Sequence, residues 1–189
     1  MTDTATTRTS PPDEDSRPYR FVDHIASLLR EDGAARRALA SGLRPWTGEP
    51  PGAMNRYLAP WLPTDLHPQR LRAYCTVAAL MTTASRTGIG SGVSIGTALG
   101  RASRSLSATT TELALRRVAR HTTAGPYTHL RGAVRLADAA GIALDWARLL
   151  RELDSWYFTG SRTCTQWQQD YYRITENLPT ANTPTTDSE

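Results

Sequence analysis

Apolar residues recur every three to four positions along the body of the chain, which is the spacing of one face of an α-helix. Phe21, Ile25, Leu28 and Leu29 follow this spacing near the beginning, and residues 71–85 form the most apolar segment. The sequence lacks the sustained apolar-polar alternation and the Asn-Gly turns that are typical of β-hairpins. The pattern therefore predicts an all-α fold, with 71–85 at the centre of its N-terminal core.

Breaks in the helical pattern divide the body into two parts. We expect an N-terminal helical part over residues 18–105, interrupted by a proline-rich break. Residues 106–177 are expected to form a second part, a short-looped helical bundle. The polar segments 1–17 and 178–189 contain proline and show no periodicity, so we expect them to be disordered tails.

Local start and stop signals predict four helices in the bundle. Thr109 and Glu112 have the spacing of a capping box, which opens the first helix. The later helices begin at a Pro or at an Asp or Ser cap, and glycines end two of them. The expected limits are Thr109 to about His121, Pro126 to Gly141, Asp145 to Gly160, and Ser161 as the cap of the fourth helix.

Three glycines spaced four residues apart, Gly92, Gly96 and Gly100, would line one face of a helix. Glycine inside a helix costs about 1 kcal/mol relative to alanine. A close approach of another backbone would offset this cost. The partner is either a neighbouring helix, which we favour, or a nucleic-acid strand.

The positive charge is carried by arginine alone, because all 22 basic residues are Arg. Eight arginines lie between Leu80 and Ala137, where Glu112 is the only acidic residue. The acidic tails lower the formal net charge to +4, so the body is more basic than this number indicates. Such a surface attracts a polyanion.

Other classes of chemistry lack a sequence signal. The four histidines are not paired with Cys or acidic residues at metal-ligand spacing, so we expect no metal or cofactor. The glycine-rich segment near residue 90 lacks the Gly-Lys-Ser/Thr ending of a phosphate loop, and no nucleophile motif is present, so we expect no enzymatic activity.

We expect Cys75 and Cys164 to be reduced thiols. Without a membrane span or a signal peptide, a cytoplasmic protein is expected.

The order of several segments resembles the CasB family, the small subunit of the type I-E CRISPR surveillance complex called Cascade. These segments cover roughly residues 20–176, and the best matches are the Ser-Ile-Gly-x-Ala-Leu segment at 94–99 and the stretch 130–153. In order they are AARRAL, QRLRAYCTVAAL, GVSIGTALGRAS, ELALRRVARH, HLRGAVRLADAAGIALDWARLLREL and WQQDYYR.

The resemblance implies a non-catalytic, all-α protein of two helical parts that acts in antiviral defence. It implies a small-subunit dimer beside CasA, CasC, CasD, CasE and crRNA, with basic surfaces that guide target and non-target DNA strands in the R-loop. Most of the expected nucleic-acid-binding residues match basic positions of the family, and either Arg70 or Arg72 matches the one that opens its helix. The expected residues are Arg36, Arg37, Arg70, Arg72, Arg101, Arg104, Arg116, Arg117, Arg120 and Arg131.

Two other classes of function are compatible with the residues. The helices predicted at about 109–121 and 126–140 could form a helix-turn-helix regulator, with Tyr127, Thr128 and Arg131 facing base edges. A helical adaptor that contacts only protein would bind no free nucleic acid. A strand-guiding subunit instead binds independently of sequence, and five or six arginines on single-stranded phosphates give a salt slope of about −4.

Overall fold

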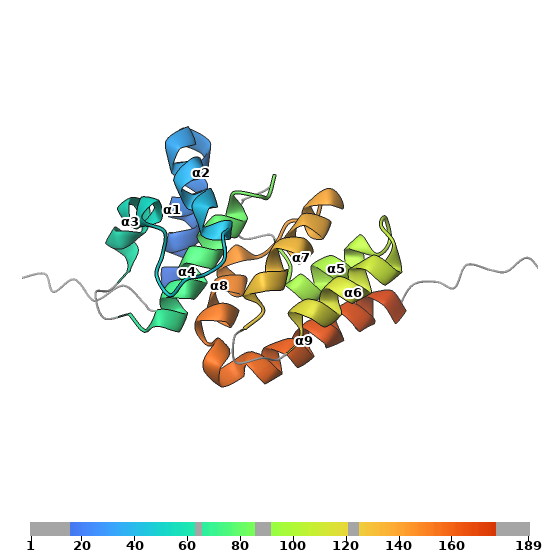
Figure 1. Cartoon of the computed structure of the whole chain (residues 1–189). Coiled ribbons are helices and arrows are strands. Elements are labelled where there is room, and N and C mark those ends of the chain that lie inside the picture. The colour runs from blue at the N-terminus through green and yellow to red at the C-terminus, as the bar shows by residue number, and fades with distance from the viewer. Residues whose placement is uncertain (1–15, 63–65, 86–91, 121–124, 177–189) are drawn as a thin grey trace, which may run out of the picture.

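The computed structural model describes residues 16–62, 66–85, 92–120 and 125–176. Nine α-helices make up most of these residues, and no strand occurs among them, which confirms the all-α prediction (Figure 1). The expected tails, the Gly88–Gly90 loop and His121 lie outside the described residues, apart from the last residues of the N-terminal tail. The helices are α1 Arg17–Glu31, α2 Gly33–Ala40, α3 Gly52–Leu58, α4 Pro68–Met81, α5 Ile95–Ala102, α6 Ala108–Val118, α7 Tyr127–Ala139, α8 Trp146–Asp154 and α9 Trp156–Glu176.

Helices α1 and α2 are separated by a cap at Asp32. The Asp32 carboxylate accepts hydrogen bonds from the backbone N–H groups of Ala34 and Ala35, at 2.7 and 3.0 Å. These two bonds satisfy N–H groups that a helix leaves without partners at its beginning. They also hold the pKa of the Asp32 carboxyl below its usual value. The chain therefore turns at Asp32 instead of continuing α1.

Helix α4 lies at the centre of the N-terminal helices, as the apolar segment 71–85 predicts. Its buried side chains include Tyr74, Cys75 and Leu80, and it packs against α1, α2 and α8. Figure 1 shows α1–α4 on one side, α5, α6 and α9 on the other, and α8 between them. The buried apolar residues form one continuous cluster across both sides.

Helices α5 and α9 approach each other at glycine. A Cβ atom at Gly96 would overlap the backbone of Trp167, and one at Gly100 would lie 3.0 Å from the carbonyl oxygen of Tyr171. The expectation that the glycines admit a neighbouring helix is therefore confirmed for these two residues. Gly92 lies outside α5, in the segment that pairs with Leu144 through an isolated bridge at Val93.

Two of the predicted helix signals in the C-terminal half are confirmed. Gly141, with φ of +71°, follows the last turn of α7, and its N–H donates to the carbonyl of Asp138. The next N–H, of Ile142, donates to Ala137, which completes the 6→1 and 5→2 pattern of a Schellman motif. Asp145 caps α8 by accepting the N–H of Arg148 at 2.8 Å.

Two other signals were wrong. Ser107, and not Thr109, caps α6, because its hydroxyl accepts the N–H of Thr110. The break between the last two helices falls at Ser155, and α9 runs through Gly160 and Ser161. Gly160 is buried, and the apolar stripe of α9 continues on both sides of it, so packing offsets the local cost of glycine.

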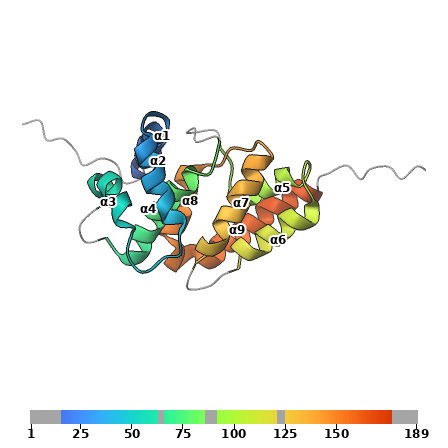
Figure 2. The ribbon, with the colours of Figure 1, turned by 45° about the horizontal axis from the view of Figure 1, so that its top comes forward.

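Figure 2 shows α9 passing along α5 and α6, with α7 beside these two helices. Helix α7 contacts α5, α6 and α4. It therefore lies where the two sides of the molecule meet, and its exposed face borders both. Within the described residues, no helix is long and apolar enough to cross a membrane.

Candidate nucleic-acid interface

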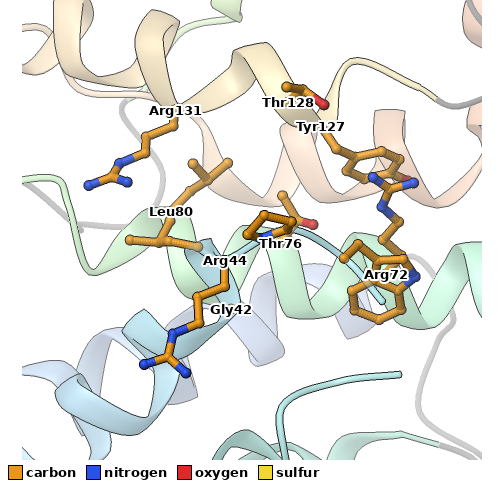
Figure 3. A pocket seen from close by; sticks show the side chains of 11 residues that line it. Gly42, Arg44, Arg72, Thr76, Leu80, Tyr127, Thr128 and Arg131 are labelled. Carbon is orange, nitrogen blue, oxygen red and sulfur yellow. The ribbon is translucent and has the colours of Figure 1, made fainter. Parts of the chain in front are cut away.

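A groove of about 450 Å³ lies between α4, α7 and the segment 42–46 that follows α2. Three arginines line it, and none of the described residues that line it is acidic. Figure 3 shows Arg44 and Arg131 toward one end of this groove and Arg72 with Tyr127 toward the other. Thr76 and Thr128 add hydroxyl groups to the walls. We call this hollow groove 1.

Aromatic rings hold the side chain of Arg72 in place. Its guanidinium carbon lies 4.1 Å from the centre of the Tyr127 ring and 5.9 Å from that of Trp46. Partial burial lowers the pKa of Arg72 and raises the pKa of Tyr127 to about 12. An arginine remains charged in such a site. Groove 1 therefore contains a fixed, partly desolvated positive charge, which strengthens its attraction for an anion.

A second groove, of about 570 Å³, lies between α6 and α7. Arg117 of α6 and Arg135 of α7 line it together with His129, and its lining within the described part of the chain also lacks acidic residues. Thr128 belongs to both grooves. Groove 2 therefore meets groove 1 at α7. Together the two grooves form a surface that we call the arginine track, with Arg44, Arg72, Arg117, Arg131 and Arg135 as its members.

Arg36, Arg70 and Arg116, three of the predicted site residues, donate hydrogen bonds to backbone or carboxylate groups of the chain. Arg70 forms a bidentate ion pair with Asp154, with both N–O distances 2.8 Å. Arg116 donates to Glu112 at 2.7 Å. The guanidinium of Arg36 donates to the carbonyl oxygens of Thr82 and Leu29, so it joins α2 to the ends of α4 and α1. The structure therefore gives these three arginines a role in packing or surface pairing.

The other predicted residues fall into two groups. The structure brings Arg72, Arg117 and Arg131 together in the arginine track. The remaining four are exposed and line neither groove, and their role in binding stays a prediction; they are Arg37, Arg101, Arg104 and Arg120.

Two members of the track were missing from the predicted set. Arg135 lies one turn after Arg131 on α7, and this spacing is a signal that sequence alone contains. Arg44 lies between Leu43 and Pro45 in an irregular segment, where no periodicity indicates which side chains share a face. Its place in the track depends on how the segment packs against α4 and α7.

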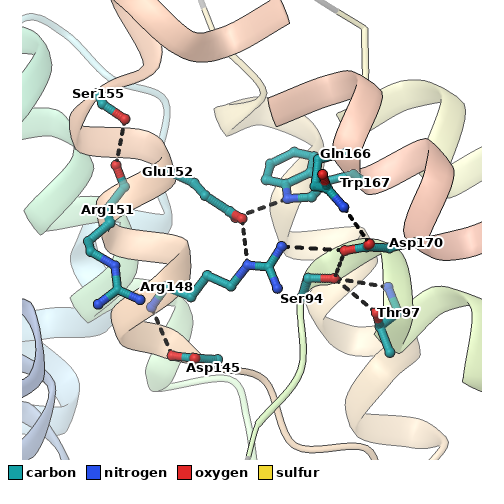
Figure 4. Close-up of polar contacts among 10 residues, drawn as sticks. All are labelled: Ser94, Thr97, Asp145, Arg148, Arg151, Glu152, Ser155, Gln166, Trp167 and Asp170. Carbon is teal, nitrogen blue, oxygen red and sulfur yellow. Dashed lines mark hydrogen bonds and ion pairs between the residues drawn. The ribbon is translucent and has the colours of Figure 1, made fainter. Parts of the chain in front are cut away.

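A partly buried polar network holds the helices behind the track in register. Arg148 of α8 bonds to Glu152 at 2.8 Å and to Asp170 of α9 at 3.4 Å. Asp170 also accepts the hydroxyl of Ser94, the cap of α5, at 2.6 Å, and Trp167 donates to Glu152 at 2.9 Å (Figure 4). Burial raises the pKa of Glu152, and the bond from Arg148 opposes this shift.

Arg148 and Glu152 have the i,i+4 spacing of an ordinary surface pair, but in the structure both belong to this partly buried network. The acidic partner that draws Arg148 inward is Asp170, 22 residues further along the chain. Among the described residues, no three His, Cys, Asp or Glu side chains are grouped so that they could hold a metal ion.

Comparisons with known proteins agree with this architecture. The family model of the CRISPR-associated protein Cse2 matches residues 34–172. A chain of a solved structure described as a CRISPR RNA-guided surveillance complex is 28% identical, with a TM-score of 0.70 over 86% of this chain and 94% of that chain. CasB from Thermus thermophilus is 26% identical, with a TM-score of 0.66 over 82% and 97% of the two chains.

CasB of M. ruber, at 20% identity and a TM-score of 0.68 over 85% of this chain and 95% of that chain, shares the fold. No curated protein matches the chain significantly. The Cse2 model spans most of the described helices, from α2 into α9. The chain therefore belongs to the Cse2 (CasB) family of CRISPR-associated proteins.

Proposed function

We propose that this protein is the non-catalytic small subunit of a type I-E CRISPR surveillance complex, in which it stabilises the R-loop. The observation that carries the proposal is the arginine track, two adjoining grooves whose described lining contains five arginines and no acidic residue. A solved relative lies within a CRISPR RNA-guided surveillance complex, which supports the same setting for this chain. Its partners would be CasA, CasC, CasD, CasE, crRNA and a second copy of the chain.

The track suits the holding of a displaced strand because of the energetics of the R-loop. The heteroduplex that forms is about as stable as the DNA duplex that it replaces, so modest contacts to the strands shift the equilibrium. Arginine can hold a phosphate with two hydrogen bonds, and phosphate contacts carry no sequence information. The track therefore favours the open R-loop for any target sequence, while base pairing with crRNA supplies the specificity.

The test is the lifetime of the R-loop in the reconstituted complex. Arg117→Ala together with Arg131→Ala removes one arginine from each groove, and charge-assisted hydrogen bonds of about 1.5–3 kcal/mol each predict a lifetime at least tenfold shorter. Arg116→Ala is the matched control, because Arg116 neighbours Arg117 on α6 but pairs with Glu112. An unchanged lifetime in the double variant, with the complex fully assembled, contradicts the proposal.

The helix-turn-helix alternative is disfavoured by the surroundings of Tyr127. Its ring packs against Arg72, and partial burial raises its pKa, so it is not presented to base edges. Such a regulator would discriminate between DNA sequences, whereas the arginine track predicts equal affinity for unrelated sequences. An adaptor that contacts only protein would assemble normally but leave R-loop lifetime independent of the track.

A further inference from the structure

The junction of α8 and α9 exposes two aromatic rings side by side. Trp156 turns into the core, where its ring centre lies 5.7 Å from that of Trp167. The next two residues point outward, and Tyr157 is 73% and Phe158 is 87% exposed. Their ring centres lie 5.1 Å apart at an interplanar angle of 88°. An edge-to-face pair leaves at least one ring face open to a further stacking partner.

A polar hollow of about 270 Å³ lies at the same junction. Arg151 and Arg162 line it together with Glu152, Gln166 and the hydroxyl side chains of Ser155, Thr159 and Thr163. Arg162 follows Phe158 by four residues on α9, so the two side chains lie one turn apart on the same side of the helix. The aromatic pair and the hollow are therefore adjacent, and we call the two together the elbow.

The elbow is electropositive because its acidic residues are already engaged. Both carboxylate oxygens of Glu152 accept hydrogen bonds, one from Arg148 and one from Trp167 (Figure 4). Asp154 is held by the bidentate pair with Arg70. In the part of the chain that the structure describes, no ion pair joins Arg151 or Arg162 to an acidic residue, although Arg151 lies over the ring of Tyr19.

We propose that the elbow is a second nucleic-acid contact, in which Tyr157 and Phe158 stack on a base of a single strand and the hollow binds its phosphate. Guanidinium and hydroxyl groups are common ligands of phosphate, and an aromatic face next to a basic surface is the usual platform for unpaired bases. A protein partner would cover the pair from an apolar rim, whereas the neighbouring groups here are polar: hydroxyls, an amide, two guanidinium groups and the carboxylate of Glu152, which already accepts from Arg148 and Trp167.

This inference rests on the proposed function and adds to it. The arginine track makes phosphate contacts only, so it binds a strand whether or not the strand carries bases. The elbow binds bases as well, and none of its residues belongs to either groove. It also explains selectivity for a displaced strand, because bases in a duplex are already stacked and cannot reach the rings.

The experiment compares the affinity of the full chain for two probes at low salt. One is a short mixed-sequence DNA strand, and the other is a strand of the same length in which abasic units replace the bases. Loss of one stacked base costs about 1–3 kcal/mol, so Tyr157→Ala with Phe158→Ala should weaken binding to the ordinary strand roughly tenfold and leave the abasic strand unaffected. Arg162→Ala should weaken binding to both strands.

Tyr172→Ala is the matched control, because Tyr172 is a partly exposed aromatic residue of α9 away from the elbow. An unchanged affinity of the double variant for the ordinary strand overturns the elbow proposal, as does the absence of binding by the parent protein. A variant that binds DNA normally but fails to join the reconstituted complex identifies the elbow as a protein contact instead. The R-loop lifetime of the groove variants is independent of these outcomes, so the proposed function stands or falls separately.

Discussion

The salt dependence of binding counts the arginines that engage phosphates, and the structure supplies the expected number. For single strands the slope of log affinity against log salt is about −0.7 for each phosphate neutralised. Counting the track alone and leaving out the elbow, five arginines that each neutralise one phosphate give a slope of about −3.5. Affinity then falls by about two orders of magnitude between 50 and 200 mM salt.

Replacing Arg117 and Arg135 by alanine removes both arginines that line groove 2 and leaves the three arginines of groove 1 in place. Three contacts remain, so we expect a slope of about −2.1 and a loss of affinity over the same salt range of about 20-fold. Fluorescence anisotropy of a labelled strand across a salt series measures both slopes. Strands of unrelated sequence should give the same values.

A second pair of substitutions separates local contact from net charge. Arg30→Ala with Arg56→Ala also removes two positive charges, but from exposed positions of α1 and α3 that line neither groove. If only the track arginines contact phosphates, this variant has the same slope of log affinity against log salt as the parent protein. If both double variants lower the slope equally, binding responds to total charge, and the assignment of the track is refuted.

Two further predictions concern stability. Gly96→Ala should lower the free energy of unfolding by about 3 kcal/mol in urea denaturation, because the new Cβ overlaps the backbone of Trp167 and forces α5 away from α9. The control is Gly132→Ala, where a Cβ meets nothing within 4 Å and should raise the free energy of unfolding by up to about 1 kcal/mol. Equal effects of the two substitutions would contradict the close approach of α5 and α9. The lowered pKa of Asp32 means that its charge stabilises the folded state above the ordinary Asp pKa of about 3.9 and that this contribution is lost below it. The difference in unfolding free energy between the parent and Asp32→Asn should therefore be largest near neutral pH and shrink as the pH falls below about 4. A difference that stays constant with pH would show that the charge of Asp32 does not contribute to stability.

The sequence predicted where a helix begins or ends when a single residue determines that end through contacts within one turn. Gly141 takes a positive φ and Asp145 accepts an N–H three residues ahead, so both signals act within one turn. The predicted helix ends were wrong where two signals in the sequence compete. Ser107 and Thr109 are both acceptable caps of α6, and the burial of Gly160 outweighs its tendency to stop a helix.

The arginines show a different limit of sequence reasoning. Sequence places the positive charge correctly in the chain, but the fold decides which charges are neutralised. Asp154 lies 84 residues from Arg70, and the carbonyl of Thr82 lies 46 residues from Arg36. No spacing rule connects groups so far apart. The same packing brings Arg44 from an irregular segment into groove 1, so the track becomes visible only in three dimensions.

The glycine contact between α5 and α9 also has a consequence for synthesis on the ribosome. Helix α5 ends at Ala102, and its partner α9 begins at Trp156, more than fifty residues later. At about 5–20 residues per second, several seconds pass before the partner exists. During this time α5 can pack against α6 and α7 but lacks α9, its most extensive partner in the finished fold. The packing around Gly96 and Gly100 is therefore completed only when the last helix has been made.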